Sequence, residues 1–296
     1  MSNLVLITRA NFLLLTIVIV AAGLSASFYA HGVFNPFDAF LVLIGALLTH
    51  MAVNVFNNYF DYRSKIDART NKTPFSGGVD ILVEGKMKPS LAFGVGLLCL
   101  IGAAVIGAYF LTRLFYPLLP ILLYGLVAIC LYTPVLSKIH ALSEIVAGTG
   151  FGLMGLGAYL TQARLLDATG IAVFVPVSIL VGLLLFLNEF PDVEADKAAG
   201  RRHVVILLGR WKSACIYVIF LVATYLSILL AVVAGAAPLT VLVSLITTPI
   251  AYKAVLIVLK NYDRVPELVP ALGLNVTIIL STIALLAVGF LIGSYF

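Results

Sequence analysis

The chain has 296 residues, of which 62% are hydrophobic and 10% are charged, and its formal net charge is +5. Soluble domains carry about 25% charged residues, and one of this size has too little interior to hide so many apolar side chains. The composition therefore excludes a soluble protein and predicts an integral membrane protein, because a lipid bilayer solvates apolar surface directly.

Apolar windows follow one another along the whole chain. A membrane-spanning helix needs about 20 mainly apolar residues. Nine windows have that length, at 10–30, 37–57, 90–112, 117–135, 141–162, 171–190, 214–234, 238–260 and 268–295. No soluble domain interrupts the series, so we expect a single all-α domain over residues 1–296, with nine transmembrane helices around a central cavity.

Basic residues are distributed unevenly between the two ends of these windows. If the N-terminus is cytoplasmic, sixteen of the eighteen lysines and arginines lie on the cytoplasmic side, and only Arg113 and Arg164 lie opposite. This bias is typical of membrane proteins and needs no nucleic-acid partner to explain the net charge. It predicts, for a prokaryote, a protein of the cell inner membrane with its C-terminus on the non-cytoplasmic side.

Two polar segments interrupt the pattern of apolar helix and short loop. The first is NVFNNYFDYRSKID, residues 54–67, and the second is NEFPDVEADKAAGRRH, residues 188–203. They follow the second and the sixth windows, which leave the membrane on the same side. We therefore expect both segments at the cytoplasmic mouth of one site.

Both segments repeat a four-residue step. The step joins Asn57 to Asp61 in the first segment, and Asn188 to Asp192 to Asp196 in the second. Residues four apart lie on one helix face with their side chains about 5–6 Å apart. Solvated loop charge would explain one such step, but two steps that begin with asparagine on one membrane face favour a site.

The face that carries Asp61 continues backwards to Asn54 and His50, deeper in the predicted span. Polar groups at that depth are costly and normally face an interior cavity. We therefore predict that Asn54 and His50 form a polar stripe in the cavity. The alternative for His50 is a buried structural group.

The residue types in the two segments indicate metal and phosphate chemistry. Oxygen ligands favour a hard cation, and Mg²⁺ is typically held by one or two carboxylates together with substrate phosphates. Basic side chains beside the acids are suited to bind further phosphate oxygens. They are Arg63, Arg69, Lys72, Lys197, Arg201 and Arg202. Above an apolar bundle, such a site suits a ligand with a diphosphate head and an apolar tail.

The two segments resemble the aspartate-rich motifs of the UbiA superfamily of intramembrane prenyltransferases. The first motif has the form NDxxDxxxD, or NDYFDYxxGxD in the menaquinone branch, and residues 57–67 are NNYFDYRSKID. The second has the form NNxRDxExDxxAGKxTLxxxLG, and residues 188–209 are NEFPDVEADKAAGRRHVVILLG. The chain departs from these patterns at Asn58, Lys65, Glu189, Pro191 and His203.

The resemblance implies a UbiA-like fold and an enzyme that transfers a prenyl chain from a prenyl diphosphate to a small aromatic acceptor in the bilayer. It implies Mg²⁺ as the cofactor, with Asp61 and Asp192 as catalytic carboxylates. The implied metal ligands are Asn57, Asp61, Asp67, Asn188, Asp192 and Asp196.

A third segment, LYTPVLSKIHALSEIVAGTGFG at 131–152, also resembles the family, between its fourth and fifth helices. By this resemblance Tyr132 would face the allylic cation, which an aromatic ring stabilises. Its alternative is an aromatic residue of the membrane interface. Lys138 would bind diphosphate, and its alternative is an ordinary cytoplasmic charge.

Five glycines crowd the window at 141–162. Small residues permit close helix packing in membranes. They also leave room for an isoprenoid chain, and the sequence is compatible with both roles. They are Gly148, Gly150, Gly152, Gly155 and Gly157.

The wording of the motifs favours 1,4-dihydroxy-2-naphthoate as the acceptor, in menaquinone biosynthesis. A 4-hydroxybenzoate, a geranylgeranylglyceryl phosphate, haem and terpene cyclisation remain alternatives. A secondary transporter is the alternative from another class, but transporters typically place their sites near the membrane midplane. Here both acidic segments lie at one face.

We predict opposite locations for two reporters. One fused after Phe296 should be accessible from the non-cytoplasmic side, and one inserted in the 62–89 loop from the cytoplasm, because basic loops stay cytoplasmic. Protease protection in inverted and right-side-out vesicles measures both. Accessibility of both reporters from one side would contradict the predicted number of crossings.

Overall fold

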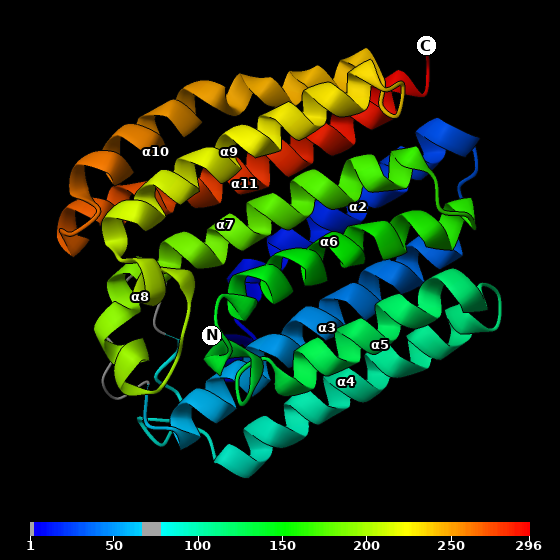
Figure 1. Cartoon of the computed structure of the whole chain (residues 1–296). Helices are drawn as coiled ribbons and strands as arrows, with labels where there is room; N and C mark the ends of the chain where they lie inside the picture. The colour runs from blue at the N-terminus through cyan, green and yellow to red at the C-terminus, as the bar shows by residue number, and fades with distance from the viewer. Residues whose placement is uncertain (1–2, 67–77) are drawn as a thin grey trace.

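The described part of the chain is built from helices. A computed structural model describes residues 3–66 and 78–296, and these residues contain no β-strand. In an apolar solvent a helix satisfies its own backbone hydrogen bonds, which is why apolar windows of this length become helices. The long helices lie side by side (Figure 1).

Each predicted window corresponds to a helical segment. The long helices are α2 (Leu13–His31), α3 (Pro36–Arg63), α4 (Pro89–Leu111), α5 (Phe115–Leu131), α6 (Leu142–Ala163), α7 (Ala168–Ala198), α9 (Arg210–Val233), α10 (Thr248–Asn261) and α11 (Val265–Gly293). The short ones are α1 (Asn3–Ile7), η1 (Ala10–Phe12), η2 (Leu136–Lys138), α8 (Val204–Leu208) and η3 (Leu239–Thr247).

Seven helical segments of the described residues are long and apolar enough to cross a membrane. They include η1 with α2, and η3 with α10, each as one continuous segment. Helix α5, at 17 residues, and the glycine-rich α6 fall outside the seven. The all-α membrane architecture is thus confirmed, and nine spans stay a prediction.

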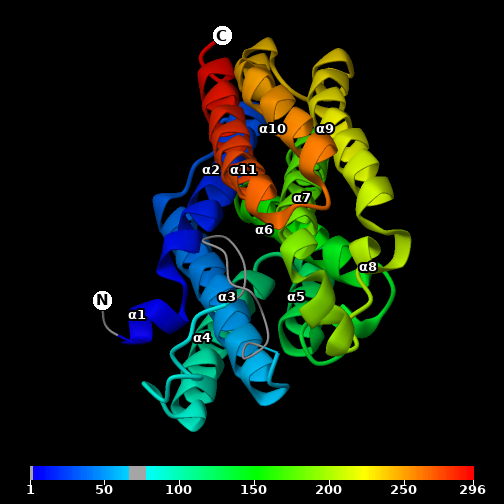
Figure 2. The same cartoon turned by 90° about the vertical axis from the view of Figure 1, so that its left-hand side faces the viewer.

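The long helices form a closed ring. From α2 to α11 each long helix packs against the next along the chain, and α11 packs against α2. Helix α2 also contacts α6 and α7, which joins the two halves of the ring. The C-terminus lies at one end of the bundle, and α1 and α8 lie toward the other (Figure 2).

Two pairs of charged or titratable side chains lie at the end where α2 finishes. His31 Nε2 lies 3.0 Å from Asp167 Oδ2, and the Tyr159 hydroxyl donates to the same carboxylate at 2.7 Å. Arg113 lies 3.3 Å from the buried Asp38 carboxylate. These contacts tie α2, α3, α4, α6 and α7 together at that end and leave the two acidic segments at the other.

An apolar cavity of about 330 Å³ lies between α3, α4, α5 and α6. Its lining includes Gly45, Thr49, Leu118, Gly150 and Gly157. This cavity lies among four helices rather than inside the whole ring, so the predicted central cavity stays a prediction.

The glycines of α6 divide between a helix contact and the lining of the cavity. A Cβ atom on Gly148 or Gly152 would collide with Ser178 on α7, so these glycines permit close packing of the two helices. Gly150 and Gly157 instead line the cavity, and a Cβ on Gly150 would meet open space. One helix thus packs tightly on one side and widens a cavity on the other.

We predict that Gly152→Ala lowers the stability of the fold. Its Cβ would overlap Ser178 and lie 2.9 Å from the Phe174 carbonyl oxygen. Overpacking of this kind costs about 1–3 kcal/mol. Gly150→Ala is the matched control on the same helix. Melting temperatures in detergent should fall for the first variant only, and equal values would contradict the packing role.

Candidate active site

Both acidic segments are helical where their four-residue steps occur. Asn57 and Asp61 lie in the last two turns of α3, which continues to Arg63. Asn188, Asp192 and Asp196 lie on α7, which continues to Ala198. The helices are longer than the predicted windows, so each step does place its side chains along one helix face.

Arg201 joins the two segments. Its Nη2 lies 2.5 Å from Asp61 Oδ1 on α3, and its Nη1 lies 2.9 Å from Asp196 Oδ1 on α7. Asp61, Asp196 and Arg201 are therefore neighbours in the fold, although the sequence separates Asp61 from Arg201 by 140 residues.

A turn at the end of α7 brings Arg201 back to Asp196. Gly200 has a φ angle of +81°, a left-handed conformation that favours glycine. The Arg201 amide then donates to the Asp196 carbonyl oxygen at 2.9 Å, which is a common way for a helix to end. The same turn points the guanidinium across to α3.

Arg201 stays charged in this position. Burial alone lowers the pKa of its guanidinium, but Asp61 and Asp196 outweigh that effect and hold the pKa above its ordinary value. A fixed positive charge therefore sits between one carboxylate of each segment.

The residues present fit a hard divalent cation. The Asn57 side-chain oxygen is buried and has no hydrogen-bond partner among residues 3–66 and 78–296. Such an oxygen costs free energy unless a ligand engages it. It lies one helical turn before Asp61, so an amide and a carboxylate oxygen are available together.

Asn54 and Asn58 form hydrogen bonds with the N-terminal segment. The Asn54 amide donates to the Thr8 carbonyl oxygen at 2.9 Å, and the Asn58 amide donates to that of Ile7 at 3.2 Å. The Asn58 oxygen accepts from Arg9 at 2.7 Å. An aspartate at 58 could accept from Arg9 but could not donate, which accounts for asparagine at this position.

His50 is buried, and its Nδ1 lies 2.7 Å from the Thr16 hydroxyl on α2. Its ring also packs edge-on against Phe151 of α6. Among the described residues that line the apolar cavity, neither His50 nor Asn54 occurs. The structure thus gives both predicted cavity residues partners in neighbouring segments.

The predicted phosphate-binding cations differ in their placement. Arg63, Lys138 and Lys197 are exposed. The third segment lies against the second, because the Arg202 amide donates to the Ser137 carbonyl oxygen at 3.3 Å and the Ala141 amide donates to that of Arg202 at 3.1 Å. Three further predicted positions lie outside the described residues: Asp67, Arg69 and Lys72.

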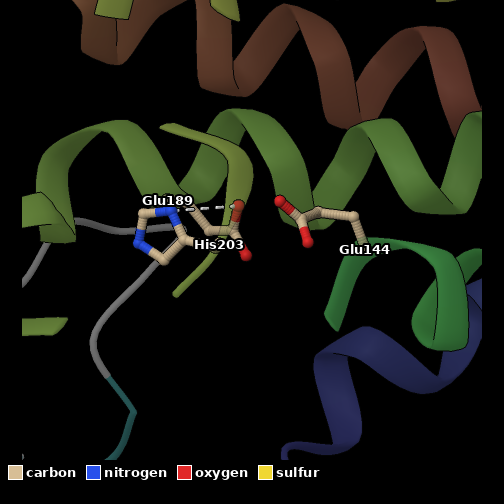
Figure 3. Close-up of side chains that lie close together, drawn as sticks. All are labelled: Glu144, Glu189 and His203. Atoms are coloured by element: carbon tan, nitrogen blue, oxygen red, sulfur yellow. Dashed lines mark ion pairs between the residues drawn. The ribbon is translucent and has the colours of Figure 1, made fainter. Parts of the chain in front are cut away.

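Sequence reasoning missed a second buried group beside Asp196. It consists of Glu144, Glu189 and His203, whose side chains lie close together (Figure 3). Glu189 and His203 are two of the positions at which the second motif departs from the family pattern. Those two departures are the sequence signal from which this buried group could have been found.

Comparison with known proteins identifies the family. Residues 15–275 match the UbiA prenyltransferase family. The chain belongs to this family. It is 27% identical over 217 residues to the 1,4-dihydroxy-2-naphthoate octaprenyltransferase of Bacillus subtilis (strain 168), an alignment that covers 72% of this chain and 68% of that relative.

Solved structures confirm the UbiA-like fold. The apo structure of a UbiA homolog from Aeropyrum pernix K1 has a TM-score of 0.73 at 16% identity and covers 95% of this chain and 98% of that one. A UbiA homolog from Archaeoglobus fulgidus bound to DMAPP and Mg²⁺ has a TM-score of 0.61 at 16% identity, with coverage of 97% and 100%.

We predict that Arg201→Gln destabilises the protein in the absence of added ligands. It would leave two carboxylates without their shared cation, and breaking a buried pair costs about 3–5 kcal/mol. Arg202→Gln is the matched control, because Arg202 is exposed and its guanidinium lies 3.4 Å from the His140 ring rather than between carboxylates. Thermal unfolding in detergent should separate the two variants, and equal melting temperatures would refute the bridging role.

Proposed function

We propose that this UbiA-family prenyltransferase transfers a prenyl chain from a prenyl diphosphate to 1,4-dihydroxy-2-naphthoate, with Mg²⁺ as cofactor. The observation that carries the proposal is the bridge from Asp61 through Arg201 to Asp196. It gathers acidic groups and a fixed cation from both segments at one end of an apolar bundle.

The proposed reaction begins with cleavage of the allylic C–O bond, whose electron pair leaves on the diphosphate oxygen. The positive charge of Arg201 would stabilise the negative charge that develops on the leaving diphosphate. Exposed Lys138 and Lys197 are suited to hold the outer phosphate oxygens.

Asn57, Asp61, Asn188, Asp192 and Asp196 would hold the metal, with Asp67 as a further ligand. When bound, Mg²⁺ supplies Lewis-acid stabilisation of the leaving diphosphate.

The second half of the reaction forms a carbon–carbon bond. The acceptor ring carbon attacks the allylic cation. That carbon then loses a proton, or carbon dioxide where it carries the carboxylate, and the electrons left behind restore aromaticity. Tyr132 would stabilise the cation with its ring face. The apolar cavity between α3, α4, α5 and α6 would hold the isoprenoid tail and exclude water that would otherwise capture the cation.

The acceptor assignment is supported by the motif wording and by the Bacillus relative named for the naphthoate. The main alternatives within the family are 4-hydroxybenzoate, geranylgeranylglyceryl phosphate and cyclisation. A transporter is opposed by the paired charges at the far end of the bundle, which leave the acidic segments at one end only. We further propose that this end is cytoplasmic.

We predict that Asp61→Ala and Asp192→Ala each reduce turnover by at least about 10³-fold, because each removes a carboxylate that holds the metal against the leaving group. EDTA should abolish activity, and Mg²⁺ should restore it. Diphosphate release from detergent-purified protein with geranylgeranyl diphosphate measures both effects. Near-normal turnover in either variant would exclude the mechanism.

We predict that the enzyme prefers 1,4-dihydroxy-2-naphthoate to 4-hydroxybenzoate by at least about tenfold. A bicyclic acceptor buries more apolar surface, and each CH₂-sized increment contributes about 0.8 kcal/mol. Competition assays with a C15–C20 prenyl diphosphate measure the ratio. Turnover of 4-hydroxybenzoate or geranylgeranylglyceryl phosphate, with none of the naphthoate, would overturn the acceptor and leave the prenyltransferase intact.

A further inference from the structure

Three buried side chains from three segments meet beside the candidate active site. Glu144 comes from the first turn of α6, Glu189 from α7 and His203 from the residue before α8. One ligand atom of each lies within 4.8 Å of the others. In Figure 3 the Glu189 carboxylate lies between the His203 ring and the Glu144 carboxylate.

The imidazole of His203 is oriented as a metal ligand would be. Its Nδ1 faces Glu189 Oε2 at 3.6 Å, and its Nε2 faces Asp196 Oδ2 at 3.3 Å, close enough for an ion pair but without a hydrogen bond between them. A metal-binding histidine usually directs its other ring nitrogen to a carboxylate, which fixes its tautomer and ring orientation. Nδ1 also lies 3.4 Å from the Ile206 amide, a long contact that a cation can displace.

Glu144 is also held in place by hydrogen bonds. The Val204 amide donates to its Oε1 at 2.7 Å, and the Ser143 hydroxyl donates to its Oε2 at 2.7 Å. Ser143 lies 3.4 Å from Glu189 Oε1 as well. Metal-binding carboxylates are commonly supported in this way, with lone pairs left over for the ion.

Glu189 has an acceptor atom that the rest of the protein does not engage. Its Oε2 is buried and has no hydrogen-bond partner among the described residues, and the 3.6 Å contact with His203 is too long to be one. The guanidinium of Arg201 is occupied by Asp61 and Asp196. Two buried carboxylates so close together need a shared proton or a cation between them.

We propose that Glu144, Glu189 and His203 bind one divalent first-row transition metal ion, such as Mn²⁺, Co²⁺ or Zn²⁺. The imidazole nitrogen distinguishes this site from the oxygen-only magnesium site, because nitrogen ligands suit transition metals and Mg²⁺ prefers oxygen. Ligand distances of about 2.1 Å require the three groups to close inward by about an ångström. The proposal does not depend on the acceptor or on prenyl transfer.

The test uses Co²⁺ because its visible absorption reports the ligands. The full-length protein carries a tag without histidine, is purified in detergent and is stripped with EDTA. It is then titrated with Co²⁺ in the presence of a large excess of Mg²⁺, which competes for the oxygen-only site. One equivalent of Co²⁺ should bind with a d–d spectrum of mixed nitrogen and oxygen ligation. Thermal unfolding should shift upward with the same midpoint.

Four variants distinguish loss of this metal site from loss of prenyl transfer. Glu189→Gln and His203→Asn should each weaken Co²⁺ binding at least about tenfold, by loss of one ligand. His140→Asn, which alters an exposed histidine outside the cluster, should bind normally. Asp192→Asn should lose prenyl transfer yet keep the Co²⁺ spectrum, which separates failure of this site from failure of the proposed function.

Two results would overturn the proposal. One is the absence of the nitrogen-containing Co²⁺ spectrum in the wild-type protein, which would leave a proton shared by Glu144 and Glu189. The other is unchanged Co²⁺ affinity in Glu189→Gln. This variant keeps the shape of the side chain, so the test survives if His203→Asn disturbs the start of α8 and fails to fold.

Discussion

The double ion pair of Arg201 is the contact on which the site depends. It joins the end of α3 to the end of α7 across 140 residues of sequence, through Asp61 and Asp196. A buried ion pair is weak evidence for net stability, because desolvation offsets much of the attraction. The consequence of the Arg201 ion pairs is that they fix where the two helices end relative to one another. Two helices that are not neighbours along the chain must end at the same level, with their polar faces toward one another.

The bilayer explains why polar groups gather at the helix ends. At the far end His31 pairs with Asp167, and Asp38 pairs with Arg113, so both carboxylates there have a partner. Between the two ends lies an apolar cavity that Gly150 and Gly157 help to line. An amphiphilic substrate with a charged head and a long apolar tail matches this gradient, because each part of it meets groups of its own polarity.

Local pattern was enough to predict the helices and the four-residue steps, because both follow from composition and helical geometry. Local pattern could not predict contacts between segments that are distant in the sequence. The bonds from Asn54 and Asn58 to the N-terminal segment depend on how α1 and η1 lie against α3. The bridge by Arg201 depends on the left-handed turn at Gly200, and periodicity carries no information about where such a turn directs the next side chain.

Departures from the family motifs have physical explanations that involve their neighbours. Lys65 stands where the resembling motif of the menaquinone branch often has glycine. Its φ angle is +59°, a left-handed conformation that costs about 1–2 kcal/mol for a residue with a Cβ atom. Glu189 and His203 depart together and face each other at 3.6 Å. Both side chains belong to the buried cluster with Glu144, so a change at either position alters the surroundings of the other. The two positions therefore have to be understood, and changed, as a pair.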